Sequence, residues 1–179
     1  MQSLISTCDF CDRHLEAVAT GMVRVLPPQF KNFGRLQSFF GQVSTLQCFE
    51  DNSLLRAALE EAGLARVLVV DGGGSTRHAL FGGNLAALAV RCGWAGVVID
   101  GCVRDVAEIA AAPLGVRALA TVPMPPRKLG AGQRGLALRI QGVTVRPGDW
   151  LYADADGILV SAEPLHMGSS SELPGAQAL

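Results

Sequence analysis

The sequence predicts an α/β protein built as a single domain. Two apolar, β-branched runs over 66–71 and 96–99 have the pattern of buried strands, and a helical pattern over 84–91 lies between them. This strand–helix–strand alternation favours parallel pairing of the two strands. A length of 179 residues suits one domain with a sizeable core that needs no disulfide or metal. We therefore expect a parallel sheet with helices packed against it.

The N-terminal half is expected to alternate helices and strands. In chain order, the predicted elements are a helix over 9–20, a loop opening at Pro27-Pro28, a strand with one exposed face over 38–49, a helix over 54–62, a buried strand over 66–71, a helix over 84–91 and a buried strand over 96–99. Gly21 and Gly63 would end the first two helices, because glycine tolerates the left-handed conformation that often follows a helix. Asp51-Asn52-Ser53 offers N-cap side chains to the second helix.

The C-terminal half is expected to become mostly β-structure. A helix over 104–112, ended by Pro113, leads into a strand over 115–121. The segment 125–135 is rich in Pro, Gly and basic residues, which predicts a mobile loop. Short strands are predicted over 136–140, 143–146, 150–153 and 158–161. The domain is assigned to residues 1–165, and residues 166–179, rich in Ser, Gly and Pro, are predicted to form a flexible tail.

Composition and charge argue against several classes of function. Fifteen Lys and Arg face sixteen Asp and Glu, and the basic residues are scattered, so no direct nucleic-acid binding is expected. Gly, Pro, Arg and Asp interrupt every apolar stretch before it reaches the length of a membrane span. Five irregularly spaced cysteines, and an N-terminus without a basic segment followed by an apolar one, favour reduced thiols and a cytoplasmic location.

Two loops at predicted strand ends carry the strongest candidate site. Arg104 and Asp105 follow the strand over 96–99, where ligand sites form in α/β proteins. The guanidinium could hold a substrate anion and the carboxylate a hard metal ion. Gly82 and Gly83 immediately precede the helix over 84–91, which leaves its first N–H groups free to face an anion. The structural alternatives are an ion pair at a helix start and a turn with a glycine N-cap.

Other motifs are better explained by structure than by chemistry. Gly72-Gly73-Gly74 follows a strand, but Arg77 stands where a dinucleotide-binding loop has its third glycine. Cys8 and Cys11 could share a metal with His14, but the second cysteine pair of a zinc site is missing. His78 could act as a base near the glycine-rich loop, although a lone histidine is more often structural. Three aromatic groups, Trp94, Trp150 and Phe39-Phe40, are expected to pack in the core or an interface.

Several blocks of the sequence resemble one family in order and spacing. They are Gln47–Asn52, Val69–Ser75, Gly82–Leu85, Asp100–Asp105, Gly142–Asp149 and Tyr152–Asp154. The chain is identified by them as a member of the RraA-like family, which contains regulator of ribonuclease activity A and the 4-hydroxy-4-methyl-2-oxoglutarate aldolases. The resemblance covers nearly the whole chain apart from about the last dozen residues. It implies a compact β/β/α fold with a swivelling-domain-like core, assembled as a homotrimer or a hexamer with sites between subunits.

The resemblance also implies an activity and a set of site residues. By analogy with the aldolases of the family, Gly82, Gly83, Asn84, Leu85 and Arg104 would bind substrate, and Asp105 would serve a divalent cation, Mg²⁺ or Mn²⁺. Arg104 and Asp105 would be the catalytic pair. The chain departs from some relatives in carrying Gly83 where they have an acidic group, and in lacking an evident counterpart of an acidic residue that longer aldolases bring from a neighbouring subunit. These departures leave the general acid/base unassigned.

The expected reaction is metal-dependent cleavage of 4-hydroxy-4-methyl-2-oxoglutarate to pyruvate, with oxaloacetate decarboxylation as a secondary activity. Both reactions of a small 2-keto acid pass through the same enolate, which a metal and Arg104 would stabilise. No Lys lies in the matched blocks, which argues against a Schiff-base aldolase. The alternative is a protein regulator that binds and inhibits an RNA-processing endonuclease, without chemistry of its own. Arg104-Asp105 favours the enzyme, because a pure binding protein needs no metal-holding carboxylate.

Overall fold

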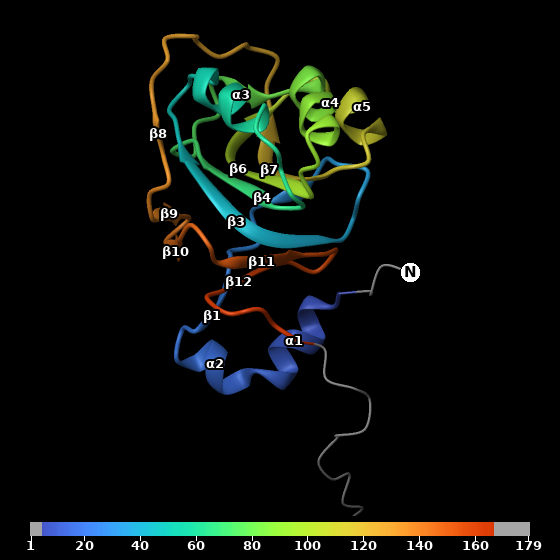
Figure 1. Cartoon of the computed structure of the whole chain (residues 1–179), viewed down its shortest axis with the longest axis vertical. Helices are drawn as coiled ribbons and strands as arrows, with labels where there is room; N and C mark the ends of the chain where they lie inside the picture. Colours follow the sequence, from blue (N-terminus) through green and yellow to red (C-terminus); the bar gives the residue numbers. More distant parts are fainter. Residues whose placement is uncertain (1–4, 167–179) are drawn as a thin grey trace, which may run out of the picture.

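The computed structural model describes residues 5–166 and confirms the α/β prediction (Figure 1). Ten of the described strands form one mixed sheet with the main order β1-β12-β11-β3-β4-β6-β7-β2, while β5 pairs with β6 and β8 with β3. Its parallel core consists of β3 (Phe39–Gln47), β4 (Val67–Asp71), β6 (Gly96–Val103) and β7 (Gly115–Thr121). The antiparallel extension is formed by β11 (Trp150–Ala153), β12 (Ile158–Ser161) and β1 (Val23–Val25).

Three helices cover one face of the parallel strands. Figure 1 shows α3 (Ser53–Leu59), α4 (Gly83–Arg91) and α5 (Val106–Ala111) grouped on the same side of the sheet. Alternate strand residues such as Leu68 and Ile99, 1% and 0% exposed, point into this interface and join the helices in the largest hydrophobic cluster. Burial of this cluster is the main stabilising term, because apolar area removed from water contributes roughly 25 cal/mol per Å².

The opposite face of the sheet packs on the C-terminal β-structure. Val69 and Val98 from the parallel strands meet residues of β9 (Leu138–Ile140), β10 (Val143–Val145) and β11 in a second cluster. The hairpin of β9 and β10 forms a separate two-stranded sheet. All four short C-terminal strands predicted from the sequence are therefore present, with boundaries within two residues of those expected.

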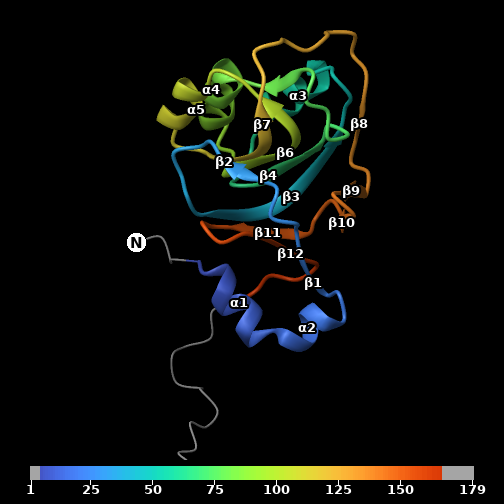
Figure 2. The ribbon, with the colours of Figure 1, turned by 180° about the vertical axis from the view of Figure 1, so that it is seen from behind.

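The predicted first helix is two helices in the structure. α1 (Thr7–Arg13) and α2 (Leu15–Ala19) are separated at His14, whose φ of −120° and ψ of 34° interrupt the helix. Both helices lie at the far end of the molecule from α3–α5, as Figures 1 and 2 show. Phe10 and Tyr152, with ring centroids 5.0 Å apart, connect this end to the sheet. No helix within residues 5–166 is long and apolar enough to cross a bilayer.

Four short strands were not predicted, and several boundaries differ from those expected. The unpredicted strands are β1, β2 (Lys31–Asn32), β5 (Ala79–Phe81) and β8 (Gln133–Arg134), of two or three residues each. Helix α3 ends at Leu59, three residues before the predicted end. Asn52 is its N-cap residue, but the Asn52 side chain makes no capping hydrogen bond, and the Ser53 N–H donates to the Asp51 carboxylate instead. Strand β6 runs on to Val103, four residues beyond the predicted end, because β5 and β7 both pair with this extension. The following helix consequently begins at Val106 instead of Arg104.

The segment 125–135 is anchored to the body of the protein. Figure 2 shows it arching over the end of the molecule between β7 and β8. The buried Asp51 carboxylate accepts a hydrogen bond from the Leu129 N–H, and Arg134 forms two 2.8 Å hydrogen bonds with Glu61. These polar contacts tie the segment to both ends of α3, and the short strand β8 lies within the stretch that the sequence predicts as a loop. The predicted tail, apart from His166, lies outside the described residues.

Candidate functional site

The two predicted site loops meet at the carboxyl ends of neighbouring parallel strands. Gly82 and Gly83 follow β5, while Arg104 and Asp105 follow β6, and β5 pairs directly with β6. The Arg104 N–H donates a 2.9 Å hydrogen bond to the Phe81 carbonyl. The Gly83 N–H donates a 3.3 Å hydrogen bond to the Asp105 carboxylate. A short strand that the sequence did not reveal therefore brings the predicted residues together.

The conformation of Asp105 directs its side chain toward α4. Its φ of 57° and ψ of 46° lie in the left-handed region, which Asp and Asn tolerate better than most residues. Asp105 is the N-cap residue of α5, yet its side chain makes no capping hydrogen bond to that helix. It instead reaches the first N–H of α4, where the helix dipole favours a negative charge.

Arg104 and Asp105 are accessible to solvent. The Arg104 Nε and an Asp105 carboxylate oxygen are 3.7 Å apart, and both side chains are 40% exposed. An ion pair this open contributes little to stability, about 0–1 kcal/mol. The structural alternative of an ion pair that holds the helix start is therefore weak, and both groups remain available to a ligand.

The remaining predicted site residues take different positions in the first turn of α4. Asn84 is exposed, whereas the Leu85 side chain is 5% exposed and belongs to the hydrophobic core. Leu85 can therefore contact a ligand only through its backbone. The Leu85 N–H contacts the Gly82 carbonyl at 3.1 Å, so it is also partly engaged within the turn.

Glu108 is a site residue that the sequence analysis missed. A Cβ built on Gly82 would lie 2.6 Å from the Asp105 carboxylate, and one built on Gly83 would overlap the Glu108 carboxylate. The two glycines thus form a cradle into which two carboxylates from α5 fit. The available signal was the spacing of Asp105 and Glu108, because residues three apart share one face of a helix.

The Asp105 carboxylate at this cradle suits a hard divalent cation. Carboxylate oxygens are the preferred protein ligands of Mg²⁺, which usually keeps several waters and uses only one or two carboxylates. No group of three or more His, Cys, Asp or Glu side chains able to hold a metal is found within the described part of the chain. The residues therefore fit a cation only if water or substrate completes its coordination.

A second pair of carboxylates lies on the neighbouring strands β4 and β6. Asp71 and Asp100 occupy paired positions of β4 and β6, and each accepts a hydrogen bond from a glutamine, at 2.9 Å from Gln47 and 2.6 Å from Gln141. Burial, together with the charge of Asp71, raises the pKa of Asp100. Asp100 is thus a buried residue of β6 whose side chain is held by Gln141 in the β9–β10 turn. It does not belong to the loop that carries Arg104, although the two residues are close in the sequence.

The backbone N–H groups of the glycine-rich loop after β4 are engaged in hydrogen bonds within the protein. The N–H groups of Gly72 and Gly74 donate to the Asp100 carbonyl, and that of Gly73 donates to the Asp71 carboxylate. Because these donors are already used, the loop cannot cradle a phosphate as a dinucleotide-binding loop does.

His78 has structural contacts. Its Nδ1 lies 2.6 Å from the Pro125 carbonyl, and its Nε2 lies 3.6 Å from the Glu50 carboxylate. Glu50 also accepts 2.7 Å hydrogen bonds from Ser75 Oγ and Arg77 Nε, which lower its pKa. This network joins three loops at the carboxyl edge of the sheet. His78 is therefore engaged in holding the loops, which argues against a role as a free base.

The cysteines show no arrangement suited to metal or disulfide chemistry. All five are free thiols. The charge of Asp156 raises the pKa of Cys8, and burial raises that of Cys11, so both thiols stay protonated at neutral pH. Burial raises the pKa of Cys48 to about 12.

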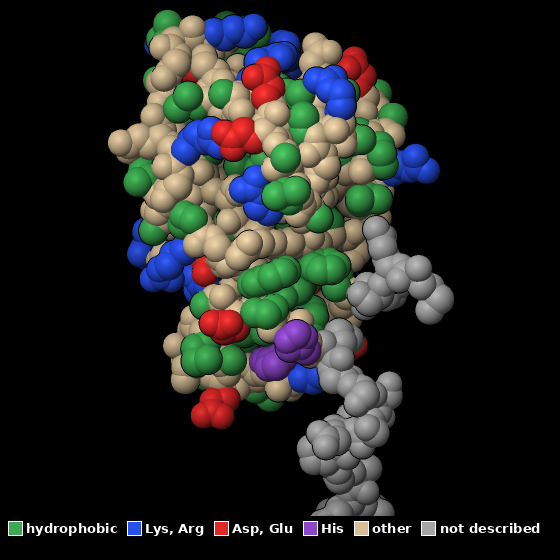
Figure 3. All heavy atoms as spheres, in the orientation of Figure 1, with side chains coloured by type: hydrophobic (Ala, Val, Ile, Leu, Met, Phe, Trp, Pro, Cys, Tyr) green, Lys and Arg blue, Asp and Glu red, His purple; other side chains and the backbone are tan. Residues whose placement is uncertain are grey.

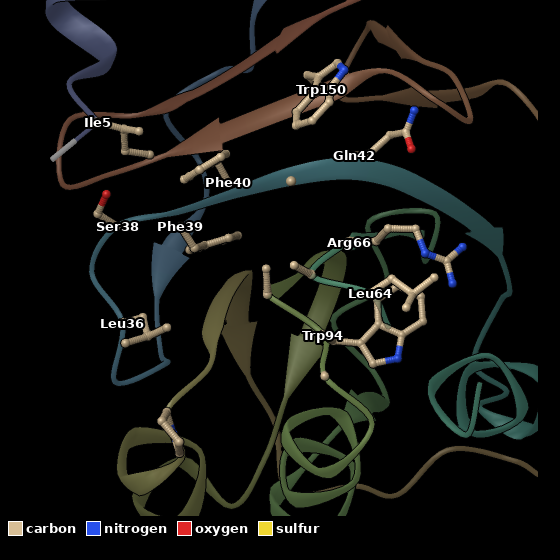
Figure 4. Close-up of a pocket in the computed structure, with 15 residues that line it drawn as sticks. Ile5, Leu36, Ser38, Phe39, Phe40, Gln42, Leu64, Arg66, Trp94 and Trp150 are labelled. Carbon is tan, nitrogen blue, oxygen red and sulfur yellow. The ribbon is translucent and has the colours of Figure 1, made fainter. Parts of the chain in front are cut away.

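An apolar groove of about 810 Å³ lies at the opposite edge of the parallel sheet (Figure 4). It is lined mainly by aromatic and aliphatic residues, including Leu36, Phe39, Phe40, Leu64, Trp94 and Trp150. Its lining includes one charged side chain, Arg66, which stacks on Trp94 and donates hydrogen bonds to Ser44 and to two backbone carbonyls. The residues of 5–166 that line the groove include no carboxylate or imidazole for proton transfer, so its chemistry does not match the predicted reaction.

Charges of both signs are mixed on the surface. Figure 3 shows basic side chains scattered over the visible face among acidic ones, without a continuous basic patch. The chain carries a formal net charge of −1. This face lacks the clustered basic residues that electrostatic binding of nucleic acid requires.

Sequence comparisons place the chain among known proteins. The family profile described as Aldolase/RraA, RraA-like, matches residues 7–160. A protein of Albidiferax ferrireducens, provisionally named a 4-hydroxy-4-methyl-2-oxoglutarate aldolase, is 58% identical over 170 residues, covering 90% of this chain and 98% of the relative. A protein of Paraburkholderia phymatum with the same provisional name is 55% identical over 160 residues, covering 89% and 98%.

Solved structures also match the chain over most of its length. The RNA-processing inhibitor RraA from Thermus thermophilis superposes with a TM-score of 0.86 at 46% identity, covering 94% of this chain and 99% of the other. A structure from Geobacillus kaustophilus, described as an S-adenosylmethionine:2-dimethylmenaquinone methyltransferase, gives 0.84 at 45% identity, covering 90% and 97%. The names attached to this one fold thus differ in function.

Proposed function

The chain belongs to the RraA-like family, and from this premise we propose that it is a divalent-metal-dependent lyase that cleaves 4-hydroxy-4-methyl-2-oxoglutarate to pyruvate. Oxaloacetate decarboxylation is its proposed secondary activity. One observation carries the proposal: Arg104 and Asp105 meet the Gly82-Gly83 start of α4. A cationic group, a carboxylate and a helix N-terminus are thereby presented together to a small anionic substrate.

Arg104 and α4 would bind the anionic part of the 2-keto acid. A guanidinium forms paired hydrogen bonds with a carboxylate, and a helix N-terminus adds backbone donors and a favourable dipole. When the C3–C4 bond breaks, negative charge develops on the keto oxygen at C2. Arg104, 40% exposed and next to the cradle, supplies a positive charge to stabilise that oxygen.

Asp105 would hold the cation, directly or through water, while its backbone keeps the left-handed conformation. A divalent cation bound there supplies a Lewis acid that polarises the keto group. Asp105 is suited to this task because its carboxylate is already turned toward the substrate side of α4. The two Lys residues of the chain, Lys31 and Lys128, lie in β2 and in the segment 125–135, so a Schiff-base route has no lysine at this site.

The site is proposed to be completed in an oligomer. Within one subunit, Arg104, Asp105 and Glu108 are open to solvent, and water would compete for the developing charge. A homotrimer, or a hexamer made of two trimers, would cover this edge with a neighbouring subunit. Such an assembly, acting on a small soluble keto acid, is proposed to work in the cytoplasm.

The second candidate function is regulation of an RNA-processing endonuclease through protein contact. The observation that favours it is the close similarity to the RraA structure described as an RNA-processing inhibitor. The methyltransferase name of another neighbour gains no support from this chain, because the N–H groups of its glycine-rich loop are occupied internally.

A steady-state assay separates the two candidates. The purified protein is incubated with 4-hydroxy-4-methyl-2-oxoglutarate or with oxaloacetate, in Mg²⁺ or Mn²⁺, and pyruvate is measured. The enzyme proposal requires turnover that a chelator abolishes and added metal restores. If neither substrate is turned over with either metal, the regulator becomes the better proposal.

A further inference from the structure

We propose that Glu108 is the catalytic proton acceptor for the substrate hydroxyl in the aldol cleavage. This inference rests on the proposed function and names the one group that the reaction needs and that the loops at 82–85 and 104–105 do not supply. It starts from a steric observation: the Glu108 carboxylate fills the space in which residue 83 would carry a side chain.

The position of Glu108 is fixed by the packing of α5 on α4. Its neighbour Ile109 is fully buried in the core shared by the two helices. The Glu108 N–H donates a 3.0 Å hydrogen bond to the Asp105 carbonyl, so Glu108 stands in the first turn of α5. From there its carboxylate overlies Gly83 as that of Asp105 overlies Gly82. The two carboxylates therefore stand side by side above the anion-binding end of α4.

The other polar side chains near the start of α4 are not available as the proton acceptor. The Asp105 carboxylate accepts the Gly83 N–H and is assigned to the cation. Arg104 is a cation, and Asn84 carries an amide that cannot accept a proton at neutral pH. The Glu108 carboxylate forms no hydrogen bond or ion pair with any side chain of the described residues, and it is exposed. It is thus a free carboxylate beside the proposed substrate position.

The proton and electron balance of the step is simple. The C4 hydroxyl proton passes to the Glu108 carboxylate, the C4–O bond becomes a carbonyl, and the C3–C4 bond breaks. Its electron pair forms the C2–C3 double bond of an enolate, and the charge goes to the C2 oxygen near Arg104. One pyruvate leaves, and the proton on Glu108 returns to C3 of the enolate to give the second. Oxaloacetate lacks a C4 hydroxyl, so its decarboxylation needs no such acceptor.

The experiment compares the two reactions in Glu108→Gln, which keeps the size of the side chain but cannot accept the proton. The kcat of aldol cleavage should fall about 10²-fold or more, the usual contribution of a general base. Oxaloacetate decarboxylation and Mn²⁺ affinity, measured by calorimetry, should stay within about 3-fold of the wild type, since neither uses that proton transfer. Glu60→Gln is the matched control, because Glu60 is an exposed glutamate at the end of α3.

A second pair of variants tests the steric relationship itself. Gly83→Ala should displace the Glu108 carboxylate and lower aldol cleavage, since its Cβ would overlap that group. In a Glu108→Gly background no side-chain atom of residue 108 remains to be displaced, so Gly83→Ala should add little to the loss already present. Independent, additive effects of the two substitutions would contradict the proposed contact.

The outcomes distinguish this inference from the proposed function. If the wild type turns over neither substrate, the proposed function fails, and the role of Glu108 fails with it. If the wild type turns over both and Glu108→Gln cleaves the aldol at an unchanged rate, only the Glu108 inference is overturned. If Glu108→Gln loses Mn²⁺ binding and both activities together, Glu108 serves the cation, and the proton-acceptor role is wrong.

Discussion

The Gly83 N–H donates a hydrogen bond to the Asp105 carboxylate, and this contact joins two loops that are 22 residues apart in the sequence. It exists because β5 and β6 run parallel and end together. The left-handed backbone of Asp105 turns the carboxylate away from its own helix and toward α4. This contact thus links the first turn of α4 to the proposed cation ligand.

Changing Asp105 to Asn should separate its charge from its structural role. Asn tolerates the left-handed region and keeps an oxygen that accepts the Gly83 N–H. We expect metal-dependent turnover of both substrates and Mn²⁺ binding to be lost, with little change in the unfolding midpoint. Asp105→Ala should lose the same activities and also unfold at a lower temperature. Full Mn²⁺ affinity in either variant would refute the assignment of the cation to Asp105.

Arg104→Lys should impair catalysis while keeping the positive charge. Lysine lacks the planar fork that binds a carboxylate through two parallel hydrogen bonds. Substrate affinity and kcat should both fall, with kcat/KM lower by ~10²-fold for both reactions. Because Arg104 is 40% exposed, thermal unfolding and the oligomeric state should be unaffected. A kcat/KM equal to that of the wild type would show that the guanidinium does not contact the substrate.

Asp100→Asn should increase stability at neutral pH. Burial, helped by the charge of Asp71, raises the pKa of Asp100, so the native state binds a proton more tightly than the unfolded state. Stability is therefore lost as the pH rises from the unfolded-state pKa, about 3.9, through the raised native value. Asn keeps the acceptor for Gln141 Nε2 and has no charge to bury. The variant should unfold at a higher temperature than the wild type at pH 7, and the difference should shrink toward pH 4 in calorimetry. A lower midpoint at pH 7 would contradict the assigned cause.

The elements with strong local patterns could be predicted from the sequence, whereas those defined by distant partners could not. The apolar runs of β4 and β6 and the Gly-bounded helix α4 have local signals that agree with their environment. The end of β6 was misplaced because Asp100 resembles a loop residue. Its place inside a strand depends on pairing with Asp71 of β4, and its side chain is held by Gln141, which is 41 residues away. Strand β5 has three residues and no alternation long enough to detect.

The same holds for the proposed site, where residues with a local sequence signal could be predicted and contacts between distant residues could not. Arg104, Asp105, Gly82 and Gly83 could be selected because their residue types and positions at strand ends suggest binding. Glu108 was missed, because its spacing of three residues from Asp105 is a weak signal and its contact with the Gly83 backbone of a different helix is defined only by the fold. The left-handed conformation of Asp105 is likewise set by the junction of β6 and α5, and the sequence carries no separate signal for it.

The isolated protein should have no strong, salt-dependent affinity for RNA. The net charge is −1, and basic side chains are interspersed with acidic ones on the surface. A protein that neutralises several phosphates loses affinity steeply as salt rises, which requires clustered Lys and Arg. Fluorescence anisotropy with a labelled single-stranded RNA, at two salt concentrations, should show only weak binding. Any effect on an RNA-processing enzyme would then act through protein contact, and tight binding that weakens steeply with salt would disprove this.

The active form should be a trimer or a hexamer. The proposed reaction places negative charge on an enolate oxygen, yet Arg104 and Asp105 are each 40% exposed within one subunit. Electrostatic stabilisation is much stronger when water is excluded, so a second subunit over this edge would increase the rate. Light scattering at micromolar concentration should give the mass of three or six chains of 18.7 kDa. Dilution to dissociation should lower aldol cleavage together with the mass. A stable monomer with full activity would show that one subunit completes the site alone.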